Sequence, residues 1–133
     1  MHKYATTIKM HQTDAAGLLF FGAQFELFHD AYESFLAAHG LSFAVLLKTK
    51  EYFVPIVHAQ GDYKAPLFVG DKVTVLIKLA NVGSTSFTLD YTVQDGKNKL
   101  VGCGQTVHVA VNKATKKKIL LPLDLRKFLA KLK

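Results

Sequence analysis

Residues 22–40 read GAQFELFHDAYESFLAAHG, and this stretch decides the fold. Its apolar and aromatic residues recur at three- and four-residue spacing, which is the period of one face of an α-helix. They are Phe25, Phe28, Tyr32, Phe35, Leu36 and His39. Gly40 then supplies a common C-terminal stop. The stretch therefore predicts a helix over 22–39 that buries an aromatic face.

The segments after this helix alternate between apolar and polar residues, which indicates β-strands with one buried face. We expect strands at 52–64, 72–80, 86–94 and 99–111, and a further short strand at 3–10. In the strand expected at 99–111, the residues assigned to the core are Val101, Cys103, Val107, Val109 and Val111. Pro122 opens a short terminal helix.

Turn residues separate these strands, as in Asn81 to Ser84 and Asp95-Gly96, and short loops favour antiparallel neighbours. One aromatic helix followed by a four-stranded antiparallel meander is arranged most simply when the sheet curls around the helix. The predicted fold class is α+β, with an antiparallel sheet on one helix.

The composition is that of a globular chain with a single domain, residues 1–133. Half of the residues are apolar and a fifth are charged, which argues against disorder. No apolar run reaches the roughly 18 residues that a membrane span needs, and no secretion signal opens the chain. The single cysteine, Cys103, forms no internal disulfide, which suits a cytoplasmic protein.

The segment 13–22, TDAAGLLFFG, combines a carboxylate, Asp14, with a glycine-containing loop that runs into the helix. The first N–H groups of a helix lack internal partners and carry the positive end of its dipole. An acyl carbonyl placed there would find donors for a developing oxyanion. Asp14 would then act as nucleophile or as base for a water molecule. The alternative is that Asp14 only caps the loop.

Residues 12–36, above all the loop Asp14 to Gly17 and the run His29 to Glu33, resemble the 4-hydroxybenzoyl-CoA thioesterase family. Within that family the run is most similar to the 1,4-dihydroxy-2-naphthoyl-CoA thioesterases. The resemblance implies a hotdog fold, in which a curled antiparallel sheet wraps around one long central helix. It also implies a homodimer or homotetramer with active sites between subunits. The implied reaction hydrolyses an acyl- or aroyl-CoA thioester to the acid and CoA.

The same resemblance assigns roles to individual residues. Asp14 matches the catalytic carboxylate, and Phe21 matches the position whose backbone N–H polarises the thioester carbonyl. Gly17, Phe20, Gly22 and Phe25 are the substrate-binding candidates. Two departures stand out: related enzymes often have histidine at the position of Phe21, and residues 83–85 lack the arginines with which the 4-hydroxybenzoyl enzyme grips CoA phosphates.

Net charge is +7, yet the lysines are scattered, and no aromatic residues interleave with a basic stripe as in nucleic-acid binders. We expect CoA as the polyanion, with neither nucleic acid nor membrane as a partner.

The histidines lack zinc spacing, so no metal and no cofactor is expected. Left open are a non-catalytic acyl-CoA-binding protein, Glu33 as a reserve carboxylate, and Lys116 to Lys118 as phosphate contacts. Cys103 is expected to be an inert buried thiol.

Overall fold

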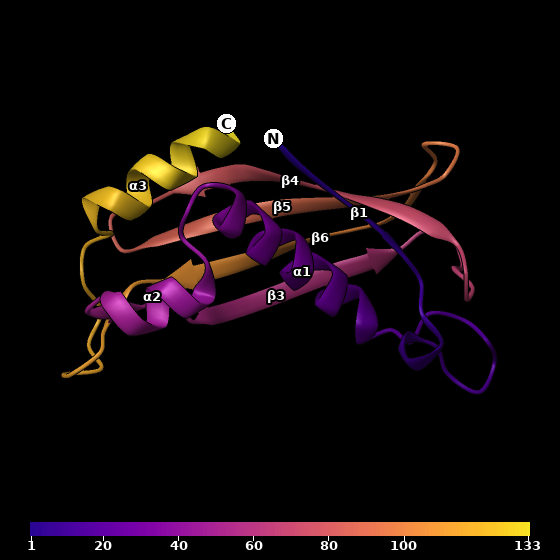
Figure 1. Cartoon of the computed structure of the whole chain (residues 1–133), viewed down its shortest axis with the longest axis horizontal. Helices are drawn as coiled ribbons and strands as arrows, with labels where there is room; N and C mark the ends of the chain where they lie inside the picture. The colour runs from indigo at the N-terminus through magenta and orange to yellow at the C-terminus, as the bar shows by residue number, and fades with distance from the viewer.

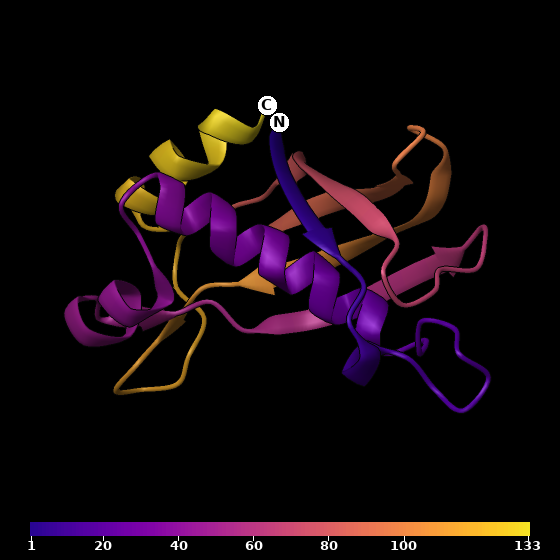
Figure 2. The same ribbon diagram turned by 45° about the vertical axis from the view of Figure 1, so that its right-hand side comes forward.

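A five-stranded antiparallel sheet forms one layer of the protein, and the longest helix lies across one of its faces (Figures 1 and 2). The computed structural model describes residues 1–133. In chain order the elements are β1 (His2–Thr7), α1 (Ala23–Ala38), α2 (Phe43–Thr49), β2 (Tyr52–Phe53), β3 (Ile56–Tyr63), β4 (Lys72–Val82), β5 (Ser86–Asp95), β6 (Leu100–Val109), β7 (Val111–Asn112) and α3 (Leu123–Leu129), with 3-10 turns at Met10–Gln12 and Ala130–Leu132. The α+β prediction is confirmed.

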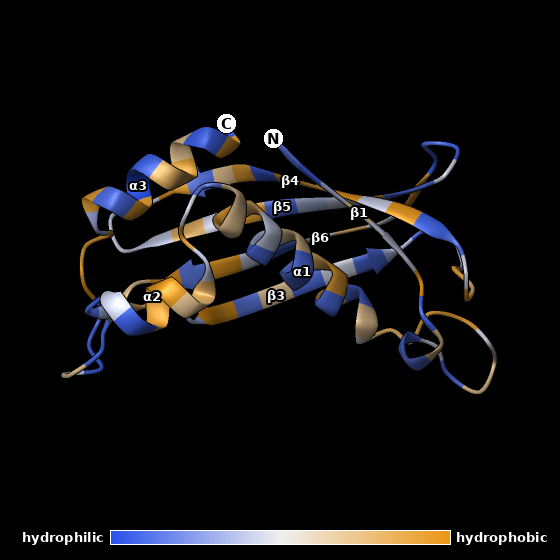
Figure 3. Cartoon of the chain, in the orientation of Figure 1, coloured by the Kyte–Doolittle hydropathy of each residue, from blue (hydrophilic) through white to orange (hydrophobic).

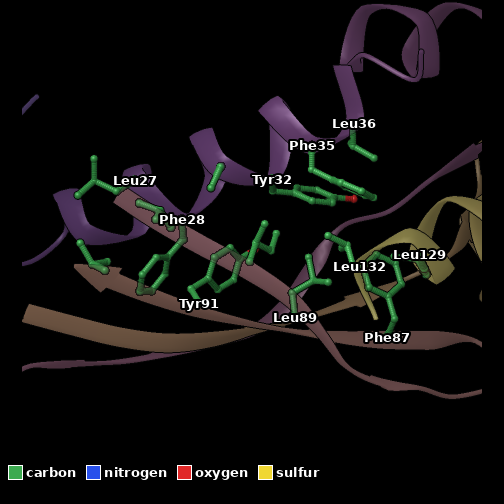
Figure 4. Close-up of a cluster of buried hydrophobic side chains, with 14 of the residues drawn as sticks. Leu27, Phe28, Tyr32, Phe35, Leu36, Phe87, Leu89, Tyr91, Leu129 and Leu132 are labelled. Atoms are coloured by element: carbon green, nitrogen blue, oxygen red, sulfur yellow. The ribbon is translucent and has the colours of Figure 1, made fainter. Parts of the chain in front are cut away.

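Helix α1 matches the helix expected from the aromatic period. Gly22 caps its start, and Gly40 beyond its end has φ +80°, a left-handed conformation that only glycine adopts without strain. Its buried face packs on the central strands, with the Phe28 ring stacked on Tyr91 at 4.6 Å between centroids. Figure 4 shows the labelled aromatic and leucine side chains of α1 facing those of β5 and the C-terminal turn. This contact is the core of the protein.

The strand order is β1-β4-β5-β6-β3, so the prediction of a four-stranded meander was wrong in one connection. Strand β3 pairs with β6, and β4 pairs with β1 and β5. The segment 64–71 that joins β3 to β4 is no tight hairpin, and it carries the chain from one edge strand to the other side of the sheet. Strand β3 therefore has a neighbour on only one side.

Between Gly102 and His108, strand β6 turns the opposite face to the core from the one expected, whereas Val101 and Val109 near its ends are buried as predicted. The residues that pair with core-facing Phe87, Leu89, Tyr91 and Val93 are His108, Thr106, Gly104 and Gly102. The two glycines let α1 approach closely, because a Cβ on Gly104 would lie 2.5 Å from the Phe28 ring. The apolar alternation predicted the wrong face because glycine leaves no hydrophobic signal where the helix needs space. Cys103 consequently lies on the outer face.

Polar groups are buried beside these glycines. Tyr91 Oη lies 3.0 Å from Thr106 Oγ1, which lies 2.7 Å from His108 Nε2. His108 is fully buried and stacks on Phe87, and burial lowers its pKa to about 3. The hydroxyl of Tyr32 and Nδ1 of His108 are buried without a hydrogen-bond partner.

The remaining elements close the ends of the sheet. The terminal helix α3 forms as expected after Pro122, and it buries Leu125 and Leu129. Helix α2 and the short β2–β7 pair were not predicted. Figure 3 shows apolar and polar residues alternating along the sheet strands. None of the helices is both long and apolar enough to cross a membrane.

Candidate active site

The loop that carries Asp14 is a tight turn closed by its own backbone. Asp14 N–H donates to the Leu18 carbonyl at 3.0 Å, and Gly17 N–H donates to the Asp14 carbonyl at 2.9 Å. Gly17 has φ +81°, which explains why a glycine is needed at this position. The Asp14 side chain accepts one hydrogen bond at Oδ1, from Ala16 N–H at 2.9 Å. Its Oδ2 atom has no protein partner.

A cleft of about 460 Å³ opens beside this turn. Its walls are mainly apolar and come from the loop, the segment after β3 and the start of β6; they include Leu18, Leu19, Ala65, Leu67 and Val101. The polar groups at its surface are Asp14, Gln24, Tyr63 and Lys64. An apolar cleft with a few convergent polar groups is typical of a small-molecule site.

Free backbone donors lie at the start of α1. The amide N–H groups of Phe21, Gly22 and Gln24 donate to no protein acceptor, whereas Ala23 N–H is held by the Phe20 carbonyl at 2.9 Å. The Tyr63 hydroxyl donates to the Phe21 carbonyl, so the end of β3 is tied to the helix start. Phe21 also lines the cleft with Asp14. Asp14 and Phe21 therefore line the same cleft, and their catalytic roles stay a prediction.

The other expected binding residues lie near the cleft and not in its walls. The Phe20 ring covers Gly22, because a Cβ there would lie 2.9 Å from it. Phe20 and Phe21 form an aromatic pair with centroids 4.5 Å apart. Phe25 packs over Gly61 of β3 and against the edge of Phe28. Their contact with substrate stays a prediction.

Sequence reasoning missed Gln24 and Tyr63. Gln24 is buried, and its side-chain amide donates to the Asp62 carbonyl at 3.2 Å. Its Oε1 atom occupies the space that a Cβ on Gly102 would need. The available signal was a glutamine on the same helical stripe as Phe28 and Ala31, since a polar residue on a buried face is worth inspecting.

The reserve candidates lie elsewhere. Glu33 is exposed on α1, with its Oε1 3.9 Å from His29 Nδ1, and neither residue lines the cleft. Cys103 is half-buried on the outer face of the sheet, with Sγ 3.9 Å from Asp62 Oδ2, so its assignment to a buried apolar face was wrong. No cluster of three or more His, Cys, Asp or Glu side chains could hold a metal ion.

The chain is similar to known proteins over nearly its whole length. A family model described as the thioesterase-like superfamily matches residues 8–129. A 1,4-dihydroxy-2-naphthoyl-CoA hydrolase of Rippkaea orientalis is 32% identical over 131 residues, which cover 97% of this chain and 95% of the relative. A hydrolase of the same name from Crocosphaera subtropica is 32% identical over 128 residues, which cover 95% and 93%.

A solved structure of an enzyme of this kind has the same fold. The crystal structure of a 1,4-dihydroxy-2-naphthoyl-CoA thioesterase from Synechocystis matches with a TM-score of 0.92 at 28% identity, and the match covers 98% of this chain and 96% of that chain. The resemblance stated from residues 12–36 is thus confirmed over nearly the whole chain. The chain belongs to the thioesterase-like superfamily of hotdog proteins and is a thioester hydrolase.

Proposed function

We propose that this protein hydrolyses an aroyl-CoA thioester, with 1,4-dihydroxy-2-naphthoyl-CoA as the first candidate substrate and 4-hydroxybenzoyl-CoA as the second, in the cytoplasm. One observation carries the proposal. Asp14, whose Oδ2 has no protein partner, and Phe21, whose N–H donates to no protein acceptor, line the same apolar cleft. The full-length similarity to the Rippkaea and Crocosphaera hydrolases supports the choice of substrate.

In the proposed mechanism the thioester carbonyl oxygen accepts from Phe21 N–H, and Gly22 N–H is a second donor. The positive end of the α1 dipole then stabilises the oxyanion as the carbonyl carbon is attacked. Asp14 either attacks that carbon itself, forming an anhydride that water opens, or removes a proton from the attacking water. By either route the C–S bond breaks, CoA leaves as its thiol and the oxygen of water ends in the acid.

Aromatic side chains support an aromatic acyl group. Phe21 lines the cleft and Phe20 packs against it, with 66% and 45% of the two residues exposed. Offset or edge-to-face contact of such rings with an aromatic acyl group contributes about 0.5–1.5 kcal/mol beyond burial. That energy corresponds to a preference of about twofold to tenfold.

The test is a comparison of kcat/KM for benzoyl- and naphthoyl-type CoA thioesters with that for C4–C12 aliphatic ones, reading the free thiol. We expect the aromatic thioesters to be the better substrates. An optimum at a medium-length aliphatic chain would overturn the aromatic assignment and leave thioester hydrolysis intact. Absence of hydrolysis with every thioester would overturn the proposed function.

We further propose a homodimer, or a homotetramer built from such dimers, in which two β3 strands pair edge to edge. Strand β3 lies at the end of the sheet order, nearly all of its residues are exposed, and its outer N–H and C=O groups have no partner. Such an edge favours pairing with another strand. A two-fold axis makes the two β3 strands antiparallel and joins the two sheets into one.

A further inference from the structure

A lysine-rich hairpin lies just beyond β7, and its backbone is closely held. The side chain of Asn112 accepts from the N–H groups of Ala114 and Thr115 at 2.8 and 2.9 Å. Lys116 N–H donates to the Asn112 carbonyl at 2.8 Å, and Asn112 N–H donates to that of Lys117 at 2.9 Å. Lys116 has φ +62°, a conformation that non-glycine residues adopt sparingly. The hairpin therefore presents its side chains from an ordered turn.

The positive charge of this hairpin is not neutralised. Its four lysines are Lys113, Lys116, Lys117 and Lys118, and none of them forms an ion pair. Lys113 donates to the Leu47 carbonyl, a neutral acceptor, and Lys116 Nζ lies 4.7 Å from the centroid of the Phe53 ring. The nearest acidic residue along the paired strand is Glu51, which contacts the hairpin through its backbone carbonyl. An uncompensated cluster of ammonium groups attracts phosphate.

Within one protomer this hairpin and the loop between β1 and α1, which carries Asp14, lie at opposite ends of β3 (Figure 1). The hairpin is tied to the start of β3, because Lys113 N–H donates to the Glu51 carbonyl and Val109 N–H to that of Pro55. The cleft is tied to its end, because Tyr63 lines it. The eight residues of β3 span roughly 26 Å.

Antiparallel pairing of two β3 strands would bring a hairpin and a cleft from different protomers close together. The start of one β3 comes beside the end of the other, so each hairpin comes beside the cleft of the opposite protomer. We propose that Lys116, Lys117 and Lys118 of one protomer bind the phosphates of the CoA thioester whose acyl group lies at Asp14 of the other protomer. This inference rests on the proposed function and on the β3 pairing.

A second basic site competes for the same role within one protomer. A cavity of about 600 Å³ shares Leu67 and Val101 with the cleft and is lined by Lys72, Lys97 and Lys99. It is also lined by Asp71 and Asp95, which leaves a net charge of one. The hairpin has more positive charge and no carboxylate among residues 112–118. The charge balance therefore favours the hairpin.

The first experiment compares two triple variants that remove the same charge. Lys116→Gln/Lys117→Gln/Lys118→Gln changes the hairpin, and Lys127→Gln/Lys131→Gln/Lys133→Gln changes the C-terminal segment. Each is assayed with one acyl group as its CoA thioester and as its N-acetylcysteamine thioester, which has no phosphate. For the hairpin variant we expect kcat/KM for the CoA thioester, relative to the phosphate-free one, to fall about tenfold or more, the scale of one charge-assisted contact. For the C-terminal variant the ratio should stay as in the wild type.

The second experiment tests whether the lysines act across the interface. Mixed dimers of an Asp14→Asn protomer and a hairpin-variant protomer are isolated with two different affinity tags. If the lysines act on the opposite protomer, one site in each mixed dimer combines an intact Asp14 with an intact hairpin. The mixed dimer should then show the wild-type KM for the CoA thioester at about half the wild-type kcat. If they act within one protomer, the mixed dimer keeps the raised KM of the hairpin variant.

Calorimetric titration with CoA separates failure of this inference from failure of the proposed function. Weakened CoA binding in the hairpin variant alone supports the phosphate site even if no thioester is hydrolysed. Equal CoA binding and equal substrate ratios in the two triple variants would overturn it. Loss of binding only in a Lys72→Gln/Lys97→Gln/Lys99→Gln variant would overturn it in favour of the second site.

Discussion

Asp14 uses one carboxylate oxygen to hold its turn and leaves the other free at the cleft. Asn at this position can still accept the Ala16 N–H through Oδ1, so the loop should keep its shape. The substitution Asp14→Asn removes the nucleophile or base, and we expect kcat to fall by about 10²-fold or more with the fold retained. Steady-state kinetics on the best CoA thioester, with circular dichroism for folding, measures both.

Glu33→Gln is the matched control for this variant. Glu33 is exposed on α1 and does not line the cleft, and its Oε1 lies 3.9 Å from His29 Nδ1, so the control should keep wild-type turnover. Near-wild-type kcat in Asp14→Asn together with a large loss in Glu33→Gln would show that the helix carboxylate is the catalytic one.

Gly104 is a point of close approach between the Phe28 ring of α1 and the sheet. A Cβ there would meet the Phe28 ring at 2.5 Å as well as the Gln60 carbonyl. We expect Gly104→Ala to lower the free energy of unfolding by about 1–3 kcal/mol, because helix or strand must shift. Urea denaturation measures the loss. Gly96→Ala, where a Cβ would meet nothing within 4 Å, should change stability little, and an equal loss in both variants would refute the packing argument.

At this scale the sequence predicted that Asp14 and Phe21 belong to one site, and both line the cleft. It missed the polar cleft residues Gln24 and Tyr63 and the residues that have only shape. Asp14 and Phe21 could be placed because a loop running into a helix start puts a carboxylate and free N–H groups within a few residues. Gly102 and Gly104 could not be read as core residues, because their function is to leave space for Phe28 and Gln24. That space is filled by side chains of α1 that lie more than 70 residues earlier in the chain.

The pairing of β5 with β6 buries the chain of polar contacts from Tyr91 through Thr106 to His108. Burial, with a smaller electrostatic effect of His29, lowers the pKa of His108 to about 3, whereas an unfolded chain titrates near 6.5. Above pH 6.5 both states are neutral at this residue. As pH falls from 6.5 towards 3, only the unfolded state gains the proton, so the free energy of unfolding decreases by up to about 1.4 kcal/mol per pH unit.

Urea denaturation between pH 7.5 and 5 checks this dependence. His108→Gln removes the titration and keeps a polar group near Thr106, so its stability should depend less steeply on pH than that of the wild type. His11→Gln, at an exposed position, is the control and should keep the wild-type slope. Parallel slopes in all three proteins would show that His108 takes no part.

Elements with a strong internal period were predictable, and their neighbours in the sheet were not. Helix α1 could be predicted from the spacing of Phe28, Tyr32 and Phe35 and from Gly40, which lies just beyond its end. The alternation of Val73, Val75 and Ile77 likewise fixes the buried face of β4. The pairing of β3 with β6 left no local signal, because alternation shows which side of a strand is apolar and not which strand lies beside it.

We expect protomers to assemble through the exposed edge of β3. We expect light scattering to show a dimer or tetramer. On dilution, the average molecular mass and the thioesterase activity should fall together. Val57→Lys places a charge on this edge at a residue that is 60% exposed in the protomer, so the fold should tolerate it while pairing and activity weaken together. Leu123→Lys, at an equally exposed position on α3, should leave both unchanged. A fully active monomer would contradict a site shared between subunits.

The order of the strands also governs when the chain can fold during synthesis. Strand β1 pairs with β4, and β3 pairs with β6, so His58 finds Val107 only after the intervening residues have left the ribosome. Until β5 and β6 emerge, Phe28 lacks its contact with Tyr91 and Tyr32 lacks its contact with His108. Pairings this distant in sequence slow folding and expose apolar surface in the meantime. The nascent chain is therefore expected to engage chaperones that hold α1 until release, and to complete its sheet only as a finished polypeptide.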